Sequence, residues 1–309
     1  MKRLILLAVI IGLALSLAVG CGDDDASLNP IVKEDGDFSD PEFQAALDAY
    51  RQASIYTSST LYWVDALIDM VTVDSGALII SDRWITVHTA SDSYLLEYHN
   101  SSQYWYLCVC RIDTIRDYAQ EIVDIQSYSL EDSIQFLQSA TPVQWPDTSL
   151  LTGMKNGIRL TSSSTATARN VNLGQLITVT GDFINMGDVT IEGRQDLEFT
   201  KYLVDADSCG YNVDVSTTAR DIQVHLGGLF HGDCPTNGTL KSSGNLGVSC
   251  SGDTTLSFND NWTVTEIFYP DSMLVVFENS TTRWKFWEEC WYGGTIVLEP
   301  LGILMAFKP

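Results

Sequence analysis

The chain has 309 residues, of which 40 are acidic and 17 are lysine or arginine, so its formal net charge at pH 7 is −23. Such an excess of negative charge repels phosphate backbones and anionic lipid headgroups, and we therefore expect no nucleic-acid partner. Apolar residues make up 45% of the chain, which is enough for a folded core and excludes global disorder.

The N-terminal segment has the order of a secretory signal. Lys2 and Arg3 form a basic head, Leu4 to Val19 form an uncharged and mostly apolar stretch, and Gly20 directly precedes Cys21. Residues Leu17 to Cys21 resemble the lipobox of bacterial lipoproteins. The resemblance implies cleavage after residue 20 and acylation of the Cys21 thiol at the new N-terminus. The alternative is an ordinary secretory signal with a coincidental cysteine.

The resemblance also implies how and where the chain is attached. A single acyl chain binds membranes only marginally, and bacterial lipoproteins carry two or three on the modified cysteine, here Cys21. Gly22 follows that cysteine instead of the Asp that retains some lipoproteins at the inner membrane. Asp23, Asp24 and Asp25 resemble the acidic tag that exports some lipoproteins to the cell surface, although they also suit a solvated linker. We expect residues 21–40 to be an acylated acidic tether and the outer membrane to be its site, on either the periplasmic or the surface side.

Residues 41–71 are expected to form an amphipathic helix. Asp40 suits the cap and Pro41 the first turn. From Phe43 to Val71, residues at alternating steps of four and three form one stripe, and its centre is polar. This pattern predicts one helix with a weak centre or two helices in tandem. We expect the stripe to pack on the concave face of the chain's own sheet, with a coiled-coil dimer as the alternative.

β-Strands are predicted from Gly76 onward. Aromatic and β-branched runs at 77–80, 83–88, 94–98 and 104–110 are separated by turn-forming residues. The stretches 117–128 and 133–138 are ambiguous between helix and strand. Prolines at 142 and 146 interrupt the pattern and indicate a long loop or a subdomain seam near 140–157.

Alternation of apolar and polar residues becomes regular beyond Gly157. It predicts strands within 170–199, 211–215 and 222–226, then a hairpin of 254–258 with 262–268 and another of 273–278 with 283–291. Residues 294–298 and 301–307 are expected to be closing strands. The predicted fold is mainly β: a curved antiparallel meander, sandwich or half-barrel, with an N-terminal amphipathic helix in a single domain of residues 41–309.

Six cysteines remain after Cys21, and their even number in an exported chain favours disulfides. Cys234 and Cys250 flank a stretch that resembles a hairpin, and they are the best single pair. Cys108 and Cys110 are two apart in a predicted strand, so they should share one face and pair elsewhere. No Cys-x-x-Cys motif or suitably spaced histidine favours a metal instead. The disulfide candidates are Cys108, Cys110, Cys209, Cys234, Cys250 and Cys290.

No cofactor is expected, and the metal candidates are weak. His225, His231 and Asp233 surround a glycine pair, but their spacing matches no usual metal motif, and a strand end followed by a loop explains them better. Asp205 to Gly210 begins like a calcium loop. It lacks the later ligands, so at most adventitious calcium is expected there.

Aromatic residues are the best candidates for ligand binding. On a strand, Trp287 and Trp291 share one face and Trp284 lies on the other. Aromatic platforms bind sugars and apolar ligands, although a tryptophan in a β domain is more often part of the core. The candidates are Trp284, Trp287, Trp291, Tyr104, Trp105 and Tyr106.

The sequence contains no recognisable catalytic motif. There is no nucleophile elbow, zinc-protease motif, phosphate-binding loop or dinucleotide glycine pattern. We expect a non-catalytic binding or structural domain on a membrane anchor, with a carbohydrate, a hydrophobic molecule or a protein as ligand. The alternatives are a lipid or hydrophobic-ligand carrier with the helix as its lid, and a hydrolase using paired carboxylates about 5 to 9 Å apart.

Overall fold

The structure is a computed structural model that describes residues 33–72, 78–80, 84–88, 93–117, 119–145, 150–183, 187–202, 209–226, 228–231, 233–250 and 256–288. The expected signal segment and Cys21, the start of the calcium-like loop, Cys290, Trp291 and the expected closing strands lie outside these residues. Residues Asp35–Pro309 form one compact unit.

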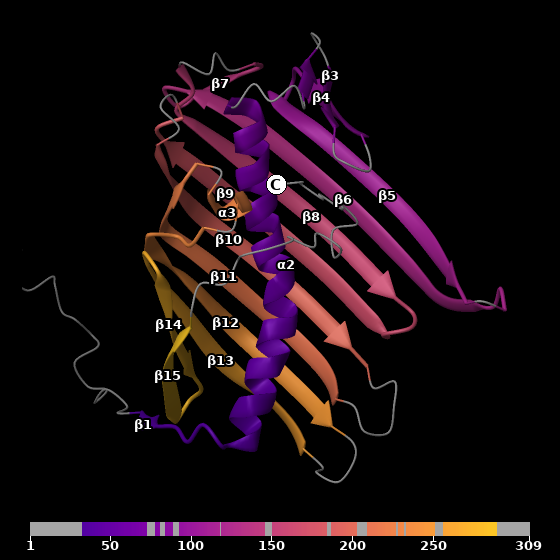
Figure 1. The fold of residues 1–309 in the computed structure, drawn as a ribbon, viewed down its shortest axis with the longest axis vertical. Helices are drawn as coiled ribbons and strands as arrows, with labels where there is room; N and C mark the ends of the chain where they lie inside the picture. Colours follow the sequence, from indigo (N-terminus) through magenta and orange to yellow (C-terminus); the bar gives the residue numbers. More distant parts are fainter. Residues whose placement is uncertain are drawn as a thin grey trace, which may run out of the picture. The chain divides into compact units, whose positions relative to one another are not determined.

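One long helix, α2 (Pro41–Thr72), begins the unit (Figure 1). The Asp40 carboxylate caps it by accepting a hydrogen bond of 2.9 Å from the backbone N–H of Glu42. The polar centre does not interrupt the helix. Its hydroxyls donate to carbonyls one turn back, Thr57 to Ser54 at 2.9 Å and Thr60 to Thr57 at 2.9 Å. The helix predicted over 41–71 is therefore confirmed as one continuous element.

The described strands belong to a single sheet, and the paired strands in it run antiparallel. From one side the order is β15, β14, β13, β12, β11, β10, β9, β8, β6, β5, β4, β3, β2, with β7 beside β6 (Figure 1). This topology confirms the predicted antiparallel meander with an N-terminal helix.

The strands fall into a long central set and a short peripheral set. The long strands are β5 (Tyr104–Arg116), β6 (Ile122–Gln138), β8 (Gly153–Ser164), β9 (Arg169–Gly181), β10 (Asp188–Lys201), β11 (Cys209–His225), β12 (Asn237–Cys250) and β13 (Leu256–Tyr269). The short ones are β1 (Glu34–Asp35), β2 (Leu78–Ile80), β3 (Trp84–His88), β4 (Ser93–His99), β7 (Thr141–Val143), β14 (Ser272–Glu278) and β15 (Thr282–Glu288), and a one-turn helix, α3 (Gly228–His231), follows β11. The ambiguous segment around 122–138 is thus a strand, and β6 and β8 pair directly across the region of the expected seam.

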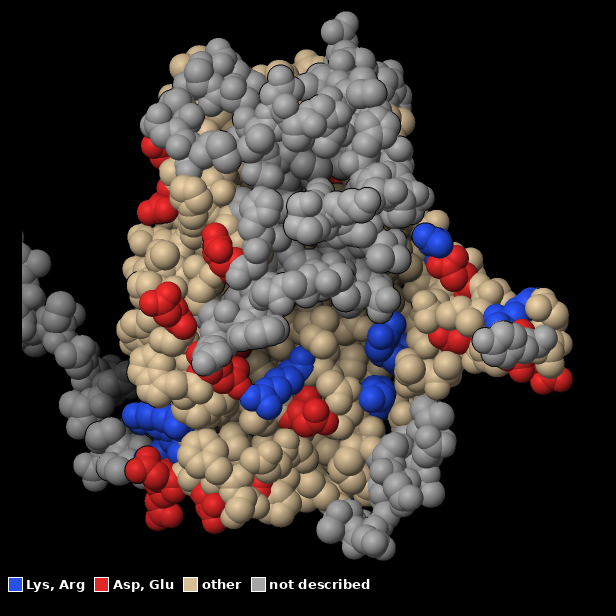
Figure 2. All heavy atoms as spheres, in the orientation of Figure 1, with Lys and Arg blue, Asp and Glu red and all other residues tan. Residues whose placement is uncertain are grey.

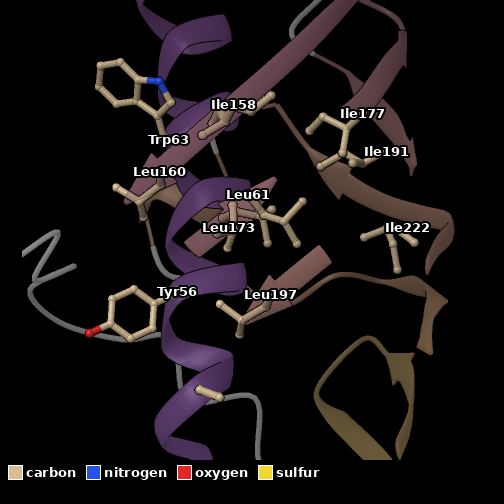
Figure 3. Close-up of a cluster of buried hydrophobic side chains, with 14 of the residues drawn as sticks. Tyr56, Leu61, Trp63, Ile158, Leu160, Leu173, Ile177, Ile191, Leu197 and Ile222 are labelled. Carbon is tan, nitrogen blue, oxygen red and sulfur yellow. The ribbon is translucent and has the colours of Figure 1, made fainter. Parts of the chain in front are cut away.

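Helix α2 covers one face of the sheet, here called the inner face. Alternate residues of the central strands are buried on the side of α2, and Figure 3 shows side chains of α2, including Trp63, beside those of these strands. At the start of the helix, the Phe43 ring stacks on Trp284 with centroids 4.7 Å apart. Each large apolar side chain buried in this way stabilises the fold by roughly 1.5 to 3 kcal/mol.

One predicted hairpin is confirmed and another is wrong. Strands β14 and β15 form the expected hairpin, and the Asn279 carboxamide oxygen in its turn accepts hydrogen bonds from the N–H groups of Thr281 and Thr282. Residues 259–261, by contrast, lie inside the continuous strand β13. They pair with Gly247, Leu246 and Asn245 of β12. Because β12 is equally long, it offers hydrogen-bond partners to backbone N–H and C=O groups that would lack them in a turn.

The predicted Cys234–Cys250 disulfide is also wrong. Cys250 bonds to Cys209, which lies opposite it in the register of β11 and β12, with 4.1 Å between the Cα atoms. The stretch before Cys250 is not a hairpin but the 14-residue strand β12, which spans roughly 45 Å and holds Cys234 far from Cys250. Cys234 forms a disulfide as well.

Cys108 and Cys110 lie on one exposed face of β5, as the strand pattern predicts. The expectation that each pairs elsewhere is wrong, since both are free thiols. On the neighbouring strand β6, the residues opposite Cys108 and Cys110 are Glu131 and Ser129. The described strand register therefore brings no third cysteine next to either thiol.

Candidate functional site

The face of the sheet opposite α2, here called the outer face, is polar. Its side chains follow the strand register in rows. One row runs from β6 to β12 without a gap, each residue directly opposite the next: Glu131, Arg159, Gly174, Asp196, Ser216 and Ser243. On the other side of the molecule, the described acidic and basic side chains are scattered over the surface and form no single patch (Figure 2).

A hollow of about 920 Å³ lies on the outer face over strands β5 to β10 and is here called the outer hollow. Two glycines, Gly157 and Gly174, place no side chain where other outward residues of these strands protrude, and Gly193 lines the hollow as well. The hollow is walled by longer side chains: Tyr106, Glu131, Arg159, Leu176, Arg194 and Asp196.

The glycines of the hollow are there for different reasons. At Gly193, beside an irregularity in the β10–β11 register, φ is +152°, and a Cβ atom would lie 2.3 Å from the carbonyl oxygen of Leu176. Backbone geometry therefore requires glycine at this position. At Gly174 a Cβ atom would meet nothing within 4 Å, so the missing side chain leaves open space.

Arg194 and Asp196 form the best-defined polar group of the hollow. The guanidinium nitrogen Nη2 of Arg194 lies 2.7 Å from Oδ1 of Asp196 and donates a hydrogen bond of 2.9 Å to the Ser216 hydroxyl. Ser216 in turn donates to Asp196. Partial burial opposes ionisation of Asp196, but the hydrogen bonds from Ser216 and Arg194 outweigh it and lower the pKa of this carboxyl. Asp196 is thus an anion held in place beside a cation.

A second polar group, on the inner face, is fully enclosed under α2. Asp132 is 2% exposed, and its carboxylate accepts hydrogen bonds from the Trp63 indole at 2.7 Å and from the Asn156 amide at 2.6 Å. The Asn156 oxygen accepts from Gln175 at 3.0 Å, and the Gln175 oxygen accepts from Gln195 at 2.7 Å. Four successive strands therefore share one buried row of hydrogen bonds.

Helix α2 closes this buried row along its own polar centre. The Gln195 amide donates to the Thr57 carbonyl at 2.8 Å and to the Thr60 hydroxyl at 3.0 Å. Farther along, the Tyr50 hydroxyl lies 3.1 Å from the Ser242 hydroxyl and donates to a Glu266 carboxylate oxygen at 3.1 Å. The polar centre of the helix, which weakens its amphipathic pattern, is matched by polar residues of the sheet.

The carboxyl groups with raised pKa point into this inner region. Asp132 is also among the residues that line the outer hollow, but its carboxylate bonds to Trp63 of α2 on the inner side. Burial raises the pKa of Asp132 to about 6, although Trp63 and Asn156 favour its ionised form. Burial likewise raises the pKa of Glu266 to about 7. A hydrolase needs a protonated carboxyl that reaches its substrate, whereas Asp132 is covered by α2.

Comparison of the chain with protein-family models, with curated proteins and with solved structures gave no match. Among the described helices, none has an apolar stretch long enough to cross a membrane. The function must therefore be inferred from the geometry and from the N-terminal segment.

The predicted aromatic candidates separate into core and surface. Trp105 and Trp284 are buried to 1% and 2% exposure, and their indoles donate to the carbonyls of Gln144 and Asp37, so they belong to the core. Trp287 is 62% exposed and lies beside Tyr269.

Tyr104 and Tyr106 lie together on β5, with ring centroids 6.1 Å apart, and His99 lies 4.6 Å from Tyr106. Of the aromatic candidates that the structure describes, only Tyr106 lines the outer hollow, and its role in binding stays a prediction.

The weak metal candidates are only partly described. His225 Nδ1 lies 3.5 Å from a carboxylate oxygen of Asp188, which gives it a partner on β10. Asp233 and His225 both flank Gly228, and the side chain of His231 is outside the described part. Within that part, no group of three or more His, Cys, Asp and Glu side chains could hold a metal ion.

The sequence did not identify Arg159, Gly174, Arg194 or Asp196 as site residues. What these residues share in the sequence is that each is polar or glycine and stands at an outward position of its strand. That signal has meaning only once the strands are paired, because residues from 131 to 216 meet through register and not through sequence spacing.

Proposed function

We propose that the protein is an exported lipoprotein, anchored through acylated Cys21, whose β domain binds a saccharide in the outer hollow without catalysis. The lipobox resemblance of Leu17–Cys21 supports the anchor, and the acidic residues that follow it favour the outer membrane. The outer hollow is the observation that supports binding.

The lining of the outer hollow favours a polyhydroxylated ligand. Arg159, Arg194 and Asp196 offer charged hydrogen-bonding groups, while Tyr106 and the 66% exposed Leu176 offer apolar contact. Hydroxyl groups of a sugar can bond to such side chains, and the faces of its ring can pack on apolar ones. A fully apolar ligand would leave the charged groups without partners, which is costly.

The carrier alternative has less support. A lipid carrier needs a large apolar cavity that encloses its ligand. The inner face, where the helix would serve as a lid, is filled by large side chains of which Trp63 is 0% exposed and Phe43 is 1% exposed. The hydrolase alternative also has less support, because the carboxylates of raised pKa, Asp132 and Glu266, bond to side chains of α2 on the inner face.

Filling the hollow tests the proposed ligand site. Gly174→Phe places a ring where a Cβ atom meets nothing within 4 Å, so the fold should tolerate it and the hollow should close. Thr180→Phe is a matched control on the same strand, exposed but outside the hollow. The mature chain in detergent is screened on a glycan array, and the best glycan is titrated by calorimetry.

We expect glycan binding by the native chain and Thr180→Phe, and at least a tenfold loss of affinity in Gly174→Phe. Equal affinity in all three chains, or no glycan bound by the native chain, would contradict the proposed site.

The anchor is tested separately. Cys21→Ser should abolish metabolic labelling with palmitate and release the protein from envelope membranes during fractionation, because the acylated thiol is removed. Unchanged labelling and sedimentation of the variant would refute the lipoprotein assignment. Protease treatment of intact cells then distinguishes the surface side from the periplasmic side.

A further inference from the structure

Two free thiols lie side by side on the outer face of β5. Cys108 and Cys110 are both exposed, and their sulfur atoms are 4.0 Å apart. Residues two apart on a strand point to the same side, so the spacing follows from the backbone. Strand pairing with β6 holds that backbone, with Cys108 opposite Glu131 and Cys110 opposite Ser129.

The strand also disfavours a disulfide between these two cysteines. An extended backbone separates the Cα atoms of alternate residues by about 6.4 to 6.8 Å. That separation is at the upper limit of what a disulfide spans, about 6.8 Å. Cys209, Cys250 and Cys234 are all disulfide-bonded in the same chain. The extended strand thus sets Cys108 and Cys110 apart as a pair of neighbouring thiols.

We propose that Cys108 and Cys110 form a two-sulfur binding site for a soft thiophilic metal ion of the copper(I) class. A metal–thiolate bond is about 2.3 Å long, so one ion holds two sulfurs about 3.8 Å apart at a tetrahedral angle and about 4.6 Å apart in a line. The observed 4.0 Å lies within this range. Binding forms two metal–sulfur bonds and releases one proton from each thiol, with no change in oxidation state.

The surroundings of the thiols favour an ion that needs few ligands. The Ser129 hydroxyl lies 3.3 Å from the Cys110 sulfur and can hydrogen-bond to its thiolate. Within the described residues, no third histidine, cysteine or acidic side chain completes a site with this pair. Structural zinc sites take four protein ligands, whereas copper(I) prefers soft thiolates.

The test compares the native pair of cysteines with a variant that has the same number of thiols at a larger distance from each other. All variants are made in a Cys21→Ser chain, so that acylation does not affect thiol counts. Cys110→Ser combined with Ile112→Cys keeps two exposed thiols on the same face of β5 but places them four residues apart, about 13 Å. Copper(I) is delivered from a coloured copper(I) chelator without oxygen, and its transfer is followed by absorbance.

We expect the native pair to take one copper(I) ion per chain from the chelator. Cys108→Ser, Cys110→Ser and the shifted pair should each bind at least a hundredfold more weakly. A thiol reagent should count two fewer thiols in the Cys108→Ser/Cys110→Ser double variant than in the native pair. The proposal is overturned if the shifted pair binds as well as the native pair, if no copper is transferred, or if the two cysteines are found in a disulfide within or between chains.

Discussion

The two faces of the central sheet are built from the same strands but have opposite chemistry. On β9, for example, Leu173, Ile177 and Val179 are buried beneath α2, while Asn172, Leu176 and Thr180 are exposed on the outer face. Because side chains alternate along a strand, one stretch of sequence specifies both a core and a surface. Helix α2 decides which of the two faces becomes the core.

Polar residues occur on both faces, but only the buried ones need a hydrogen-bond partner within the protein. On the inner face, Asp132, Asn156, Gln175 and Gln195 each hydrogen-bond to another protein group within 3.0 Å. On the outer face, residues such as Arg159 and Thr161 are exposed to water. A buried polar group without a partner costs about 1 to 3 kcal/mol, so the inner row must be complete while the outer rows are free to bind a ligand.

The largest expected effect contrasts a tryptophan of α2, buried against the inner face, with an exposed tryptophan of β15. Trp63→Ala removes a side chain that is 0% exposed and leaves Asp132 without its indole donor, so it should lower the free energy of unfolding by about 3 to 5 kcal/mol. Trp287→Ala, at a 62% exposed position, should change it by less than about 1 kcal/mol. Urea unfolding at fixed pH measures both, and similar losses would mean that the faces do not differ in packing.

The next effect is the pH dependence that Asp132 confers. Folding raises the pKa of this carboxyl from 3.8 to about 6, so the native state holds the proton more tightly than the unfolded state. The unfolding free energy should therefore fall by about 3 kcal/mol as the pH rises from about 4 to about 6. Asp132→Asn should remove this part of the profile in urea unfolding measured across that range. An unchanged slope would show that Asp132 is not the responsible group.

Asp196 on the outer face should act with the opposite sign. Its pKa is lowered in the folded protein, so its contribution to stability is present above the unfolded pKa and is lost as the pH falls through the folded pKa. Asp196→Asn should make the protein less sensitive to acid in the same assay. The effect should be much smaller than that of Asp132, because the Asp196 side chain is 56% exposed and solvent screens its ion pair.

A further contrast is between two glycines that line the outer hollow. Gly193→Ala should lower the unfolding free energy by about 1 to 3 kcal/mol, since φ is +152° and the new Cβ atom would collide with the Leu176 carbonyl. Gly174→Ala should leave stability unchanged or raise it slightly, because the site is open. Thermal unfolding of the two variants side by side tests this, and equal losses would contradict the described geometry.

The elements that were predicted correctly carry their signals locally. Asp40 and Pro41 mark the start of α2, and the alternation from 170 to 199 marks β9 and β10. The turn predicted at 259–261 failed because the signal of asparagine and aspartate for a turn is local too, and pairing of β13 with β12 overrides it. The polar centre of α2 likewise predicted a weak helix, because the local sequence does not show its hydrogen-bond partner. That partner, Gln195, is 135 residues away from Thr60.

The sequence by itself determined the periodicities, and hence a long amphipathic helix followed by an antiparallel meander, together with the expectation of a lipid anchor at Cys21. Only the tertiary structure decided that Cys209 and not Cys234 meets Cys250, that Trp105 and Trp284 are core residues, and that Gly174 lies in an open hollow. The physical reason is that periodicity depends on neighbours along the chain. Register brings together residues that are dozens of positions apart, and a shift of one residue would turn every side chain to the other face.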